Sequence, residues 1–421
     1  MRLQKIVDRL QKLHPKEIDL SLDRIKNLCR KLGNPQDKIK AISVVGTNGK
    51  NSTINAIFSI LKETNFKCNL YTSPHILKIN ERFVFNNKEL SDDELADLFE
   101  EVENINDNNE VTVFEILSAC FFYKAAQYPD NINLVEAGLF HRFDATNILK
   151  KNLASVVCSC SIDHTDWLPK NEQTIEKIIF EKTSTLLNSN IIVAKQNIKE
   201  TMDCIKKTIS QNLSNKIFFN DDFIYSVNEN NFFYYEDKLG GLKLPMPNIL
   251  GQFQLENIST AIATLRTLDL DIKDQHIQRG ITKISSLARL QEIKSGKLKE
   301  LVKNNKIIVD ASHNEDGARA LNEYLQSLDC NKHIIISMMF NKNHEKYISY
   351  FKNISSITTI DLKTQPNSIS GKDLKDKFKN IPNVQYQPDI EQAIKSIDFK
   401  EGDILLITGS LYGAAEVLNF N

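Results

Sequence analysis

The stretch "VVGTNGKNST", residues 44–53, combines residue types that could bind a phosphate. It follows an apolar run and precedes a helical pattern, so backbone N–H groups would face an anion at a helix N-terminus. Lys50 would then reach the outer phosphates of a nucleotide, and the hydroxyl of Ser52 or Thr53 could bind Mg²⁺. Asn51 separates Lys50 from Ser52, which departs from the pattern G-x-x-x-x-G-K-[ST]. An ordinary strand–turn–helix connection is the alternative interpretation.

Polar residues follow other apolar stretches as well. Ser73 and His75 lie in a loop after "CNLYTS", and Glu136 ends "INLVE". Asp163 and His164 follow the apolar run that ends in "CSCSI". The carboxyl ends of parallel strands carry the metal-binding and catalytic groups of such sheets. Each feature also has a structural interpretation: a Ser-Pro turn, an exposed charge at a strand end, or a structural histidine.

Short β-branched stretches alternate with helical patterns along most of the chain. This alternation predicts an α/β fold with a mostly parallel sheet. The aromatic, turn-rich segment 216–247 predicts a small antiparallel excursion. Beyond it, the pattern predicts a second sheet with strands in four stretches: 305–314, 332–340, 354–362 and 402–410.

At 421 residues the chain is long enough for at least two domains, and we expect them at 1–295 and 296–421. The net charge of -1 gives no support for binding nucleic acid or a membrane surface. We find no apolar run long enough to span a bilayer and no secretory signal. The odd set of seven cysteines indicates a reducing compartment, so a cytoplasmic protein is expected. Cys158 and Cys160 are interpreted as small apolar core residues.

Eight stretches, taken in order, resemble motifs of the folylpolyglutamate synthase/dihydrofolate synthase family, which belongs to the Mur-type ATP-dependent ligases. They are "VVGTNGKNST", "TSPHILKINER", "EAGLFHRFDATN", "DHTDWL", "GQFQLEN", "ARLQ", "VDASHNEDGARAL" and "LLITGSLY". Any one of them is weakly specific, but eight in the right order are strongly specific. The resemblance extends from about residue 13 to residue 415.

The resemblance implies an N-terminal P-loop ATPase-type domain and a smaller C-terminal Rossmann-like domain, with the active site between them. It also implies a ligase that activates a carboxylate with ATP to an acyl phosphate, which an amine then displaces. The expected substrates are ATP, L-glutamate, and dihydropteroate or a reduced folate. Mg²⁺, as two ions, is the expected metal, with a monovalent cation such as K⁺ as a further candidate. The family is commonly monomeric.

The resemblance also assigns roles to individual residues. ATP would contact Gly46, Thr47, Asn48, Gly49, Lys50, Asn51, Ser52, Thr53, Asn257, Arg289 and Asp310. The metal ligands would be Ser52, Ser73, Glu136 and His164. The catalytic residues would be Lys50, Lys182 and His313. The pteroate pocket would be bordered by Asp19, Leu20, Ser21, Thr112, Val113, Phe114, Glu115, Phe143, Asp144 and Ala145.

Lys182, in "FEKTSTLL", stands where the family has a carbamylated lysine in "EKAGI". Carbamylation turns a cation into an anionic oxygen ligand, which Mg²⁺ prefers; an exposed helix lysine is the alternative. The chain departs from the family at Asn51, at Phe140–His141, where "GLGGR" has two glycines, and at Thr183–Thr185. Two other functions therefore stay open: a Mur-type ligase acting on another acid, and a decayed paralogue that binds nucleotide or folate without turnover.

Overall fold

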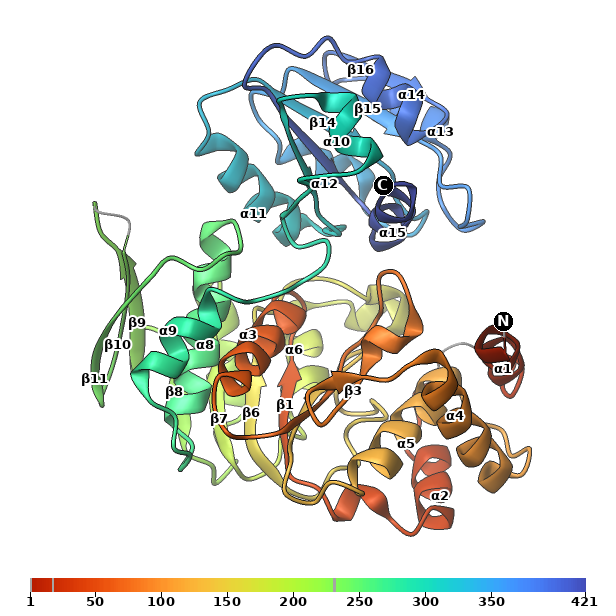
Figure 1. The fold of residues 1–421 in the computed structure, drawn as a ribbon, viewed down its shortest axis with the longest axis vertical. Coiled ribbons are helices and arrows are strands. Elements are labelled where there is room, and N and C mark those ends of the chain that lie inside the picture. Colours follow the sequence, from red (N-terminus) through yellow and green to blue (C-terminus); the bar gives the residue numbers. More distant parts are fainter. Residues whose placement is uncertain (1, 17–18, 230–231) are drawn as a thin grey trace. The chain divides into compact units, whose positions relative to one another are not determined.

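A computed structural model of the chain describes residues 2–16, 19–229 and 232–421 (Figure 1). The chain forms two units: Met1–Asn248 with Leu255–Ile284, and Ile249–Gln254 with Ser285–Asn421. The sequence places the domain boundary at residues 295 and 296, later than this division. The units divide earlier because β12 (Gln291–Glu292) pairs antiparallel with β13 (Lys306–Val309) and so belongs to the second sheet.

An eight-stranded sheet forms the centre of the first unit, in the order β4-β3-β2-β5-β1-β6-β7-β8. Six of these strands run parallel, and β3 and β4 add an antiparallel edge, so the predicted mostly parallel sheet is confirmed. The strands are β1 (Ala41–Val45), β2 (Cys68–Tyr71), β3 (Phe83–Phe85), β4 (Lys88–Glu89), β5 (Ile132–Glu136), β6 (Asn152–Val157), β7 (Asn190–Val193) and β8 (Lys216–Phe218).

Helices surround this sheet, and the described ones are α1 (Arg2–Leu10), α2 (Asp23–Lys31), α3 (Lys50–Lys62), α4 (Asp92–Asn106), α5 (Val113–Ala125), α6 (Ile175–Thr183), α7 (Lys199–Thr208), α8 (Gln252–Arg266) and α9 (Asp274–Ile281). Helix α3 packs on α9 at a glycine (Figure 1). A Cβ on Gly280 would lie 2.5 Å from the Cα of Ile60, so only glycine permits this approach. Ser59 donates a hydrogen bond to the Gly280 carbonyl at 2.8 Å.

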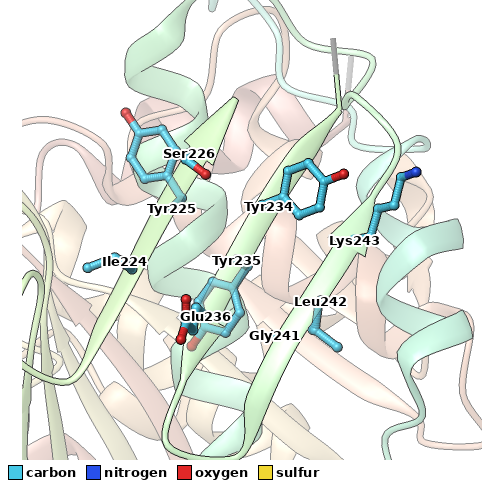
Figure 2. Close-up of a pocket in the computed structure, with 9 residues that line it drawn as sticks. All are labelled: Ile224, Tyr225, Ser226, Tyr234, Tyr235, Glu236, Gly241, Leu242 and Lys243. Atoms are coloured by element: carbon cyan, nitrogen blue, oxygen red, sulfur yellow. The ribbon is translucent and has the colours of Figure 1, made fainter. Parts of the chain in front are cut away.

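The predicted antiparallel excursion is present as a separate sheet of β9 (Phe223–Val227), β10 (Phe233–Asp237) and β11 (Gly240–Leu244). The predicted segment starts at residue 216, which is too early, because β8 pairs with β7 and belongs to the eight-stranded sheet. A groove of about 310 Å³ lies on these three strands, and Figure 2 shows the residues that line it. Its nine lining residues include none to which the sequence assigns chemistry, so the functional site must be sought elsewhere.

A six-stranded sheet forms the second unit, in the order β12-β13-β17-β14-β15-β16. The four predicted strands are confirmed as β13, β14 (Lys332–Ile336), β15 (Ser356–Ile360) and β17 (Ile404–Thr408). β12 and β16 (Val384–Gln387) are additional. The helices are α10 (Lys297–Val302), α11 (Glu315–Gln326), α12 (His344–Ser349), α13 (Gly371–Lys377), α14 (Ile390–Lys395) and α15 (Leu411–Phe420). Within the described ranges, none of the chain's helices has the length and hydropathy needed to span a membrane.

Candidate functional site

The loop between β1 and α3 depends on two glycines with positive φ, Gly46 at 144° and Gly49 at 86°. A Cβ on Gly46 would lie 2.8 Å from the Cβ of Cys158. A Cβ on Gly49 would lie 2.3 Å from Oδ1 of Asn257, on α8. Both contacts leave no room for a side chain. The loop is thereby seated between the end of β6 and α8, with Asn257 beside Gly49. The expected contact of Asn257 with ATP stays a prediction.

Backbone hydrogen bonds tie the same loop to the segment after β6. The N–H groups of Thr47 and Asn48 donate to the carbonyl oxygen of Ser159 at 2.8 and 3.1 Å. The Thr47 hydroxyl also lies 3.1 Å from the carbonyl oxygen of Ser161. The loop is therefore held in one shape, which preorganises the N-terminus of α3 for an anion.

Lys50 is the first residue of α3, and its ammonium turns back over the loop. Nζ donates to the carbonyl oxygens of Gly46 and Thr47 at 3.0 and 3.1 Å. The two predicted hydroxyls are both buried, but of the two only that of Thr53 accepts a hydrogen bond from the Cys158 thiol, so it faces the core. Ser52 is therefore the better candidate for a metal ligand.

Ser73 and Glu136 lie together at the carboxyl ends of β2 and β5. The Ser73 N–H donates to Oε2 of the buried Glu136 at 3.3 Å. Arg82, a residue without a role in the sequence analysis, donates to the Ser73 hydroxyl at 3.4 Å and to Nδ1 of His75 at 2.9 Å. Burial, together with Arg82, lowers the pKa of His75 to about 4, so this ring is a neutral hydrogen-bond acceptor.

His164 follows β6 with a left-handed backbone, at φ 57°. Its ring lies 6.4 Å from the ring of Phe140, centroid to centroid. Across the described ranges, no three or more His, Cys, Asp and Glu side chains are grouped to hold a metal ion. Mg²⁺ sites on nucleotides need only one or two carboxylates, because phosphate oxygens and water complete the shell. The oxygen donors of Ser52, Ser73 and Glu136 fit that chemistry.

Lys182 is buried in the last turn of α6, so the alternative of an exposed helix lysine is wrong. Its ammonium donates to the carbonyl oxygen of Gly46 at 3.0 Å, as Lys50 does. Burial, and secondly the charge of Lys50, lowers the pKa of Lys182 to about 8. The contact with Gly46 brings α6 to the loop between β1 and α3.

Phe140 and His141, which depart from the family pattern, both point into the protein. Phe140 has φ 55° and packs with Leu139, Leu168 and Ile178, while its ring centroid lies 5.4 Å from Nζ of Lys182. Nδ1 of His141 lies 3.2 Å from the Thr185 hydroxyl. Burial lowers the pKa of His141 to about 4, and the charge of Lys182 adds to this effect.

The motif around residues 112–115 forms the beginning of α5. Thr112 and Glu115 make a reciprocal capping box, in which each side chain accepts a backbone N–H of the other residue. Arg24 donates to Glu115 at 3.0 Å and to the carboxylate of Asp19 at 2.7 Å. It thereby joins residues 19–22, which precede α2 and are called the leader segment below, to α5. The sequence analysis gives Arg24 no role, because its partner Glu115 lies 91 residues away in the chain.

Residues 138–146 form the third part of the predicted pocket. A Cβ on Gly138 would lie 2.8 Å from Cζ of Phe114, so the loop packs directly on the start of α5. Asp144 is buried and accepts hydrogen bonds from the N–H groups of Gly138, Leu139 and Thr146 and from the Thr146 hydroxyl. Burial raises the pKa of Asp144. This carboxylate therefore shapes the loop.

The remaining predicted pocket residues lie on these same segments. Leu20 packs beside the apolar cluster of Phe140, and Ala145 is buried. Phe143 stacks on the guanidinium of Arg142, 4.2 Å from its ring centroid. Arg142 in turn makes a two-pronged ion pair with Glu181, at 2.7 Å for each bond. The sequence analysis missed this pair, which fixes the loop to α6 one residue before Lys182.

Three predicted nucleotide-side residues lie together in the second unit. Asp310, after β13, is buried and accepts the N–H groups of Leu290 and Ser312, each at 2.8 Å. Burial raises the pKa of Asp310, whereas the nearby charge of Arg289 lowers it. Nδ1 of His313 lies 3.0 Å from the carbonyl oxygen of Ala311. Asp310 therefore anchors the backbone on which Arg289 stands.

Comparison with solved structures defines the class of this protein. The Mur ligase, glutamate ligase domain, matches residues 297–411. The structure of E. coli FolC in complex with DHPP and ADP has a TM-score of 0.88 and 26% identity, covering 99% of this chain and 97% of that one. A bifunctional folylpolyglutamate synthase/dihydrofolate synthase from Yersinia pestis, complexed with AMPPNP and Mn ion, shares the fold, with a TM-score of 0.86, 24% identity and coverage of 99% and 97%. The chain is therefore a Mur-type ligase.

Curated relatives narrow the class to one family. The dihydrofolate synthase/folylpolyglutamate synthase of Haemophilus influenzae is 30% identical over 434 residues, covering 97% of this chain and 94% of its own length. Its counterpart in Bacillus subtilis is 29% identical, covering 94% of each. The chain belongs to the dihydrofolate synthase/folylpolyglutamate synthase family. The expected fold and enzyme class, an ATP-dependent acid–amino-acid ligase of folate metabolism, are confirmed.

Proposed function

We propose that this ligase adds L-glutamate both to dihydropteroate and to the glutamate tail of reduced folates. The double activity is supported by the names of the full-length relatives. One observation in the structure carries the proposal. Lys182 contacts both Gly46 of the phosphate-binding loop and Phe140 of the 138–146 loop, so nucleotide-side and acceptor-side segments are contiguous.

In the first step an acceptor carboxylate attacks the γ-phosphorus of ATP, which gives an acyl phosphate and ADP. The step brings two anions together, so it needs positive charge at the transferred phosphoryl group. Lys50 supplies one cation when its ammonium leaves the carbonyl oxygens of Gly46 and Thr47 for the phosphates. The N–H groups in the first turn of α3 bind phosphate oxygens as well.

Ser52, Ser73 and Glu136 would hold Mg²⁺, with His164 as a further ligand. The ion would neutralise phosphate charge and orient the phosphoryl group. Arg82 and the backbone of Ser73 fix the orientation of the Ser73 hydroxyl and the Glu136 carboxylate. Titration with Mg²⁺ would measure how many ions bind. Omitting K⁺ from the assay would show whether activity requires a monovalent cation.

The acceptor would lie against the leader segment, the start of α5 and the 138–146 loop. Of the described groups, none donates a hydrogen bond to Oε1 of Glu115, although this oxygen is buried. A buried oxygen without a donor is unfavourable, and an N–H group of a pterin ring would satisfy it. Arg24 holds Glu115 in place and is itself bonded to Asp19.

In the second step the amine nitrogen of glutamate attacks the acyl carbon, and inorganic phosphate leaves. The amine must first lose a proton. Asp310 and His313 belong to the matched glutamate ligase domain and lie near Arg289, which supports a role of the three residues at ATP or glutamate. We further propose that the enzyme works as a cytoplasmic monomer. Its seven cysteines are free thiols, which supports a reducing compartment.

Phosphate release from ATP tests the proposal and separates it from the two alternatives. We expect release only when glutamate is present together with dihydropteroate or with a reduced folate. Phosphate release that occurs with neither folate acceptor, but does occur with glutamate and a different carboxylic acid, would identify a Mur-type ligase of different specificity. Tight nucleotide binding without release under any of these conditions would identify a protein that has lost turnover.

A further inference from the structure

Phe140 and His164 stand on the loops that follow β5 and β6, and their rings meet edge to face. The ring centroids are 6.4 Å apart, and the ring planes make an angle of 78°. This is one of the preferred arrangements of aromatic pairs. Phe140 is only 3% exposed, whereas the side chain of His164 is 34% exposed. The imidazole is therefore packed against the protein on one side and accessible on another.

Phe140 also packs against the turn that follows His164. Its side chain belongs to one apolar cluster with Leu168, which comes directly after that turn. Within the turn, the N–H of Trp167 donates to the carbonyl oxygen of His164 at 3.1 Å. The N–H of Leu168 donates to the carbonyl oxygen of Thr165 at 2.9 Å. One buried ring thus supports the turn at both of its ends.

The backbone of His164 needs such support. Its φ of 57° lies in the left-handed region, which is unfavourable for a residue with a side chain and persists where the surroundings enforce it. The N–H of His164 donates to Oδ1 of Asp163 at 2.9 Å. Asp163 thereby fixes the backbone of His164, and Phe140 fixes its ring. Together the two contacts limit the directions in which the imidazole nitrogens can point.

Position 140 is a place where this chain departs from its family, because a glycine usually stands there. A glycine has no side chain and could contact neither the His164 ring nor Leu168. The substitution is itself unfavourable for the backbone, since Phe140 has a φ of 55°. The buried side chains of Leu139 and Ile178 hold the ring in place. The chain thus keeps a strained aromatic residue beside an expected metal ligand, and such strain is typical of functional sites.

We propose that Phe140 is a positioning residue that holds the imidazole of His164 in the orientation needed to bind a divalent cation. A ligand whose side chain is already ordered loses less conformational entropy when the ion binds. Groups that orient a metal ligand typically contribute about 10- to 100-fold in metal affinity. Phe140 makes no hydrogen bond to the imidazole, so we expect about tenfold, the lower end of that range. The inference rests on the proposed function only in taking His164 as a metal ligand.

The test uses Mn²⁺, which is paramagnetic, as the probe ion, with the full chain saturated with the ATP analogue AMPPNP. Electron paramagnetic resonance of the free Mn²⁺ measures the dissociation constant, and electron spin-echo modulation reports a nitrogen bound to the ion. In the unaltered protein we expect an imidazole-nitrogen signal that His164→Gln removes. Bicarbonate is present throughout, so that Lys182 can carry the carbamate that the family resemblance implies.

Phe140→Ala should raise the Mn²⁺ dissociation constant about tenfold and weaken the nitrogen signal. Phe140→Leu keeps more of the buried volume but lacks the ring, so it should also raise the constant, and it serves if the alanine variant does not fold. Phe122→Ala is the matched control, because Phe122 is also buried and meets Phe121 edge to face at 5.9 Å, in the second half of α5. It should destabilise the protein and leave the Mn²⁺ affinity unchanged.

Three results would overturn the proposal. One is an unchanged Mn²⁺ affinity in a folded Phe140 variant, because the ring would then not position the ligand. Another is an equal loss of affinity in Phe122→Ala, because the effect would then follow from lost stability. The third is a nitrogen signal that is missing from the unaltered protein or survives in His164→Gln. Thermal unfolding shows which variants are folded. The measurement needs neither acceptor nor glutamate, so its failure is distinguishable from failure of the proposed ligase activity.

Discussion

Arg24 and Glu115 form an ion pair, with 3.0 Å between Nε and Oε2, although they are 91 residues apart in the chain. The side chain of Glu115 is 5% exposed and that of Arg24 is 20% exposed, so solvent screens the pair only in part. Arg24 also holds Asp19. The pair therefore couples the leader segment to the N-terminus of α5, where the acceptor is proposed to bind.

Replacing Arg24 with methionine should weaken both folding and acceptor binding. The buried Glu115 would lose its cation, and we expect about 2 kcal/mol of lost stability, below the range for fully buried pairs because of the partial exposure. The KM for dihydropteroate should rise more than that for ATP. Arg2→Ala, at an exposed ion pair with Asp97, is the control and should leave the unfolding midpoint unchanged. An unaltered KM for the acceptor would contradict the proposed role of the leader segment.

Gly138→Ala should disturb the acceptor segments selectively. The new Cβ would lie 2.8 Å from Cζ of Phe114 and 3.2 Å from Oδ2 of Asp144, so the loop must move away from α5. Overpacking of this kind costs about 1–3 kcal/mol. Gly241→Ala is the matched control, because its nearest neighbour would be at 3.8 Å. Urea unfolding measures the free energy of unfolding of both variants. If the two are equally stable, the loop accommodates the added methyl group without cost and the prediction is wrong.

Lys50→Ala should strongly slow phosphate release, because a charge at the transferred phosphoryl group is lost. Removing one such electrostatic group typically costs roughly 100- to 1,000-fold in kcat. Lys62→Ala removes an exposed lysine from the end of the same helix and should retain full activity. Full activity of the Lys50 variant would contradict the proposal that residues 46–53 bind ATP. Nucleotide binding by calorimetry would then show where ATP binds instead.

The sequence predicts those parts of the molecule that local patterns determine. Alternation of apolar stretches identifies β1, β5 and the four strands of the second sheet, and the glycines at 46 and 49 mark the loop. β12 escapes prediction because two residues carry no periodicity, and β16 because its residues are polar and half-buried. Because β12 belongs to the second sheet, the division between the units falls before the predicted boundary at residues 295 and 296.

Long-range pairs account for what the sequence leaves undetermined at the site. The family resemblance points to Thr112 and Glu115, but the bond from Arg24 to Glu115 depends on how distant segments pack. The sequence likewise shows that a bulky residue, Phe140, replaces a family glycine, but it does not show that Phe140 contacts Lys182. A motif thus predicts which residues matter, whereas packing decides which of them touch.

His141 should make stability depend on pH between about 6.5 and 4. Its pKa is lowered to about 4 in the folded protein, because burial disfavours the charged ring. In the unfolded chain the pKa is about 6.5, so the unfolded state binds more protons in this window. Stability therefore falls as pH decreases through the window and levels off below it. His141→Gln should flatten this slope in urea unfolding, and an unchanged slope would assign the effect to other groups such as His75.

Asp310→Asn should loosen the segment that carries Arg289. The buried carboxylate accepts N–H groups from Leu290 and Ser312, and an amide offers only one accepting oxygen, so one donor loses its partner or meets an NH₂ group. An unsatisfied buried group costs about 1–3 kcal/mol. Arg289 should also lose its fixed position, which raises the KM for ATP. Asp376→Asn, at an exposed position on α13, is the control. If the Asp310 variant unfolds at the same urea concentration as the unaltered protein, the two hydrogen bonds do not hold this segment.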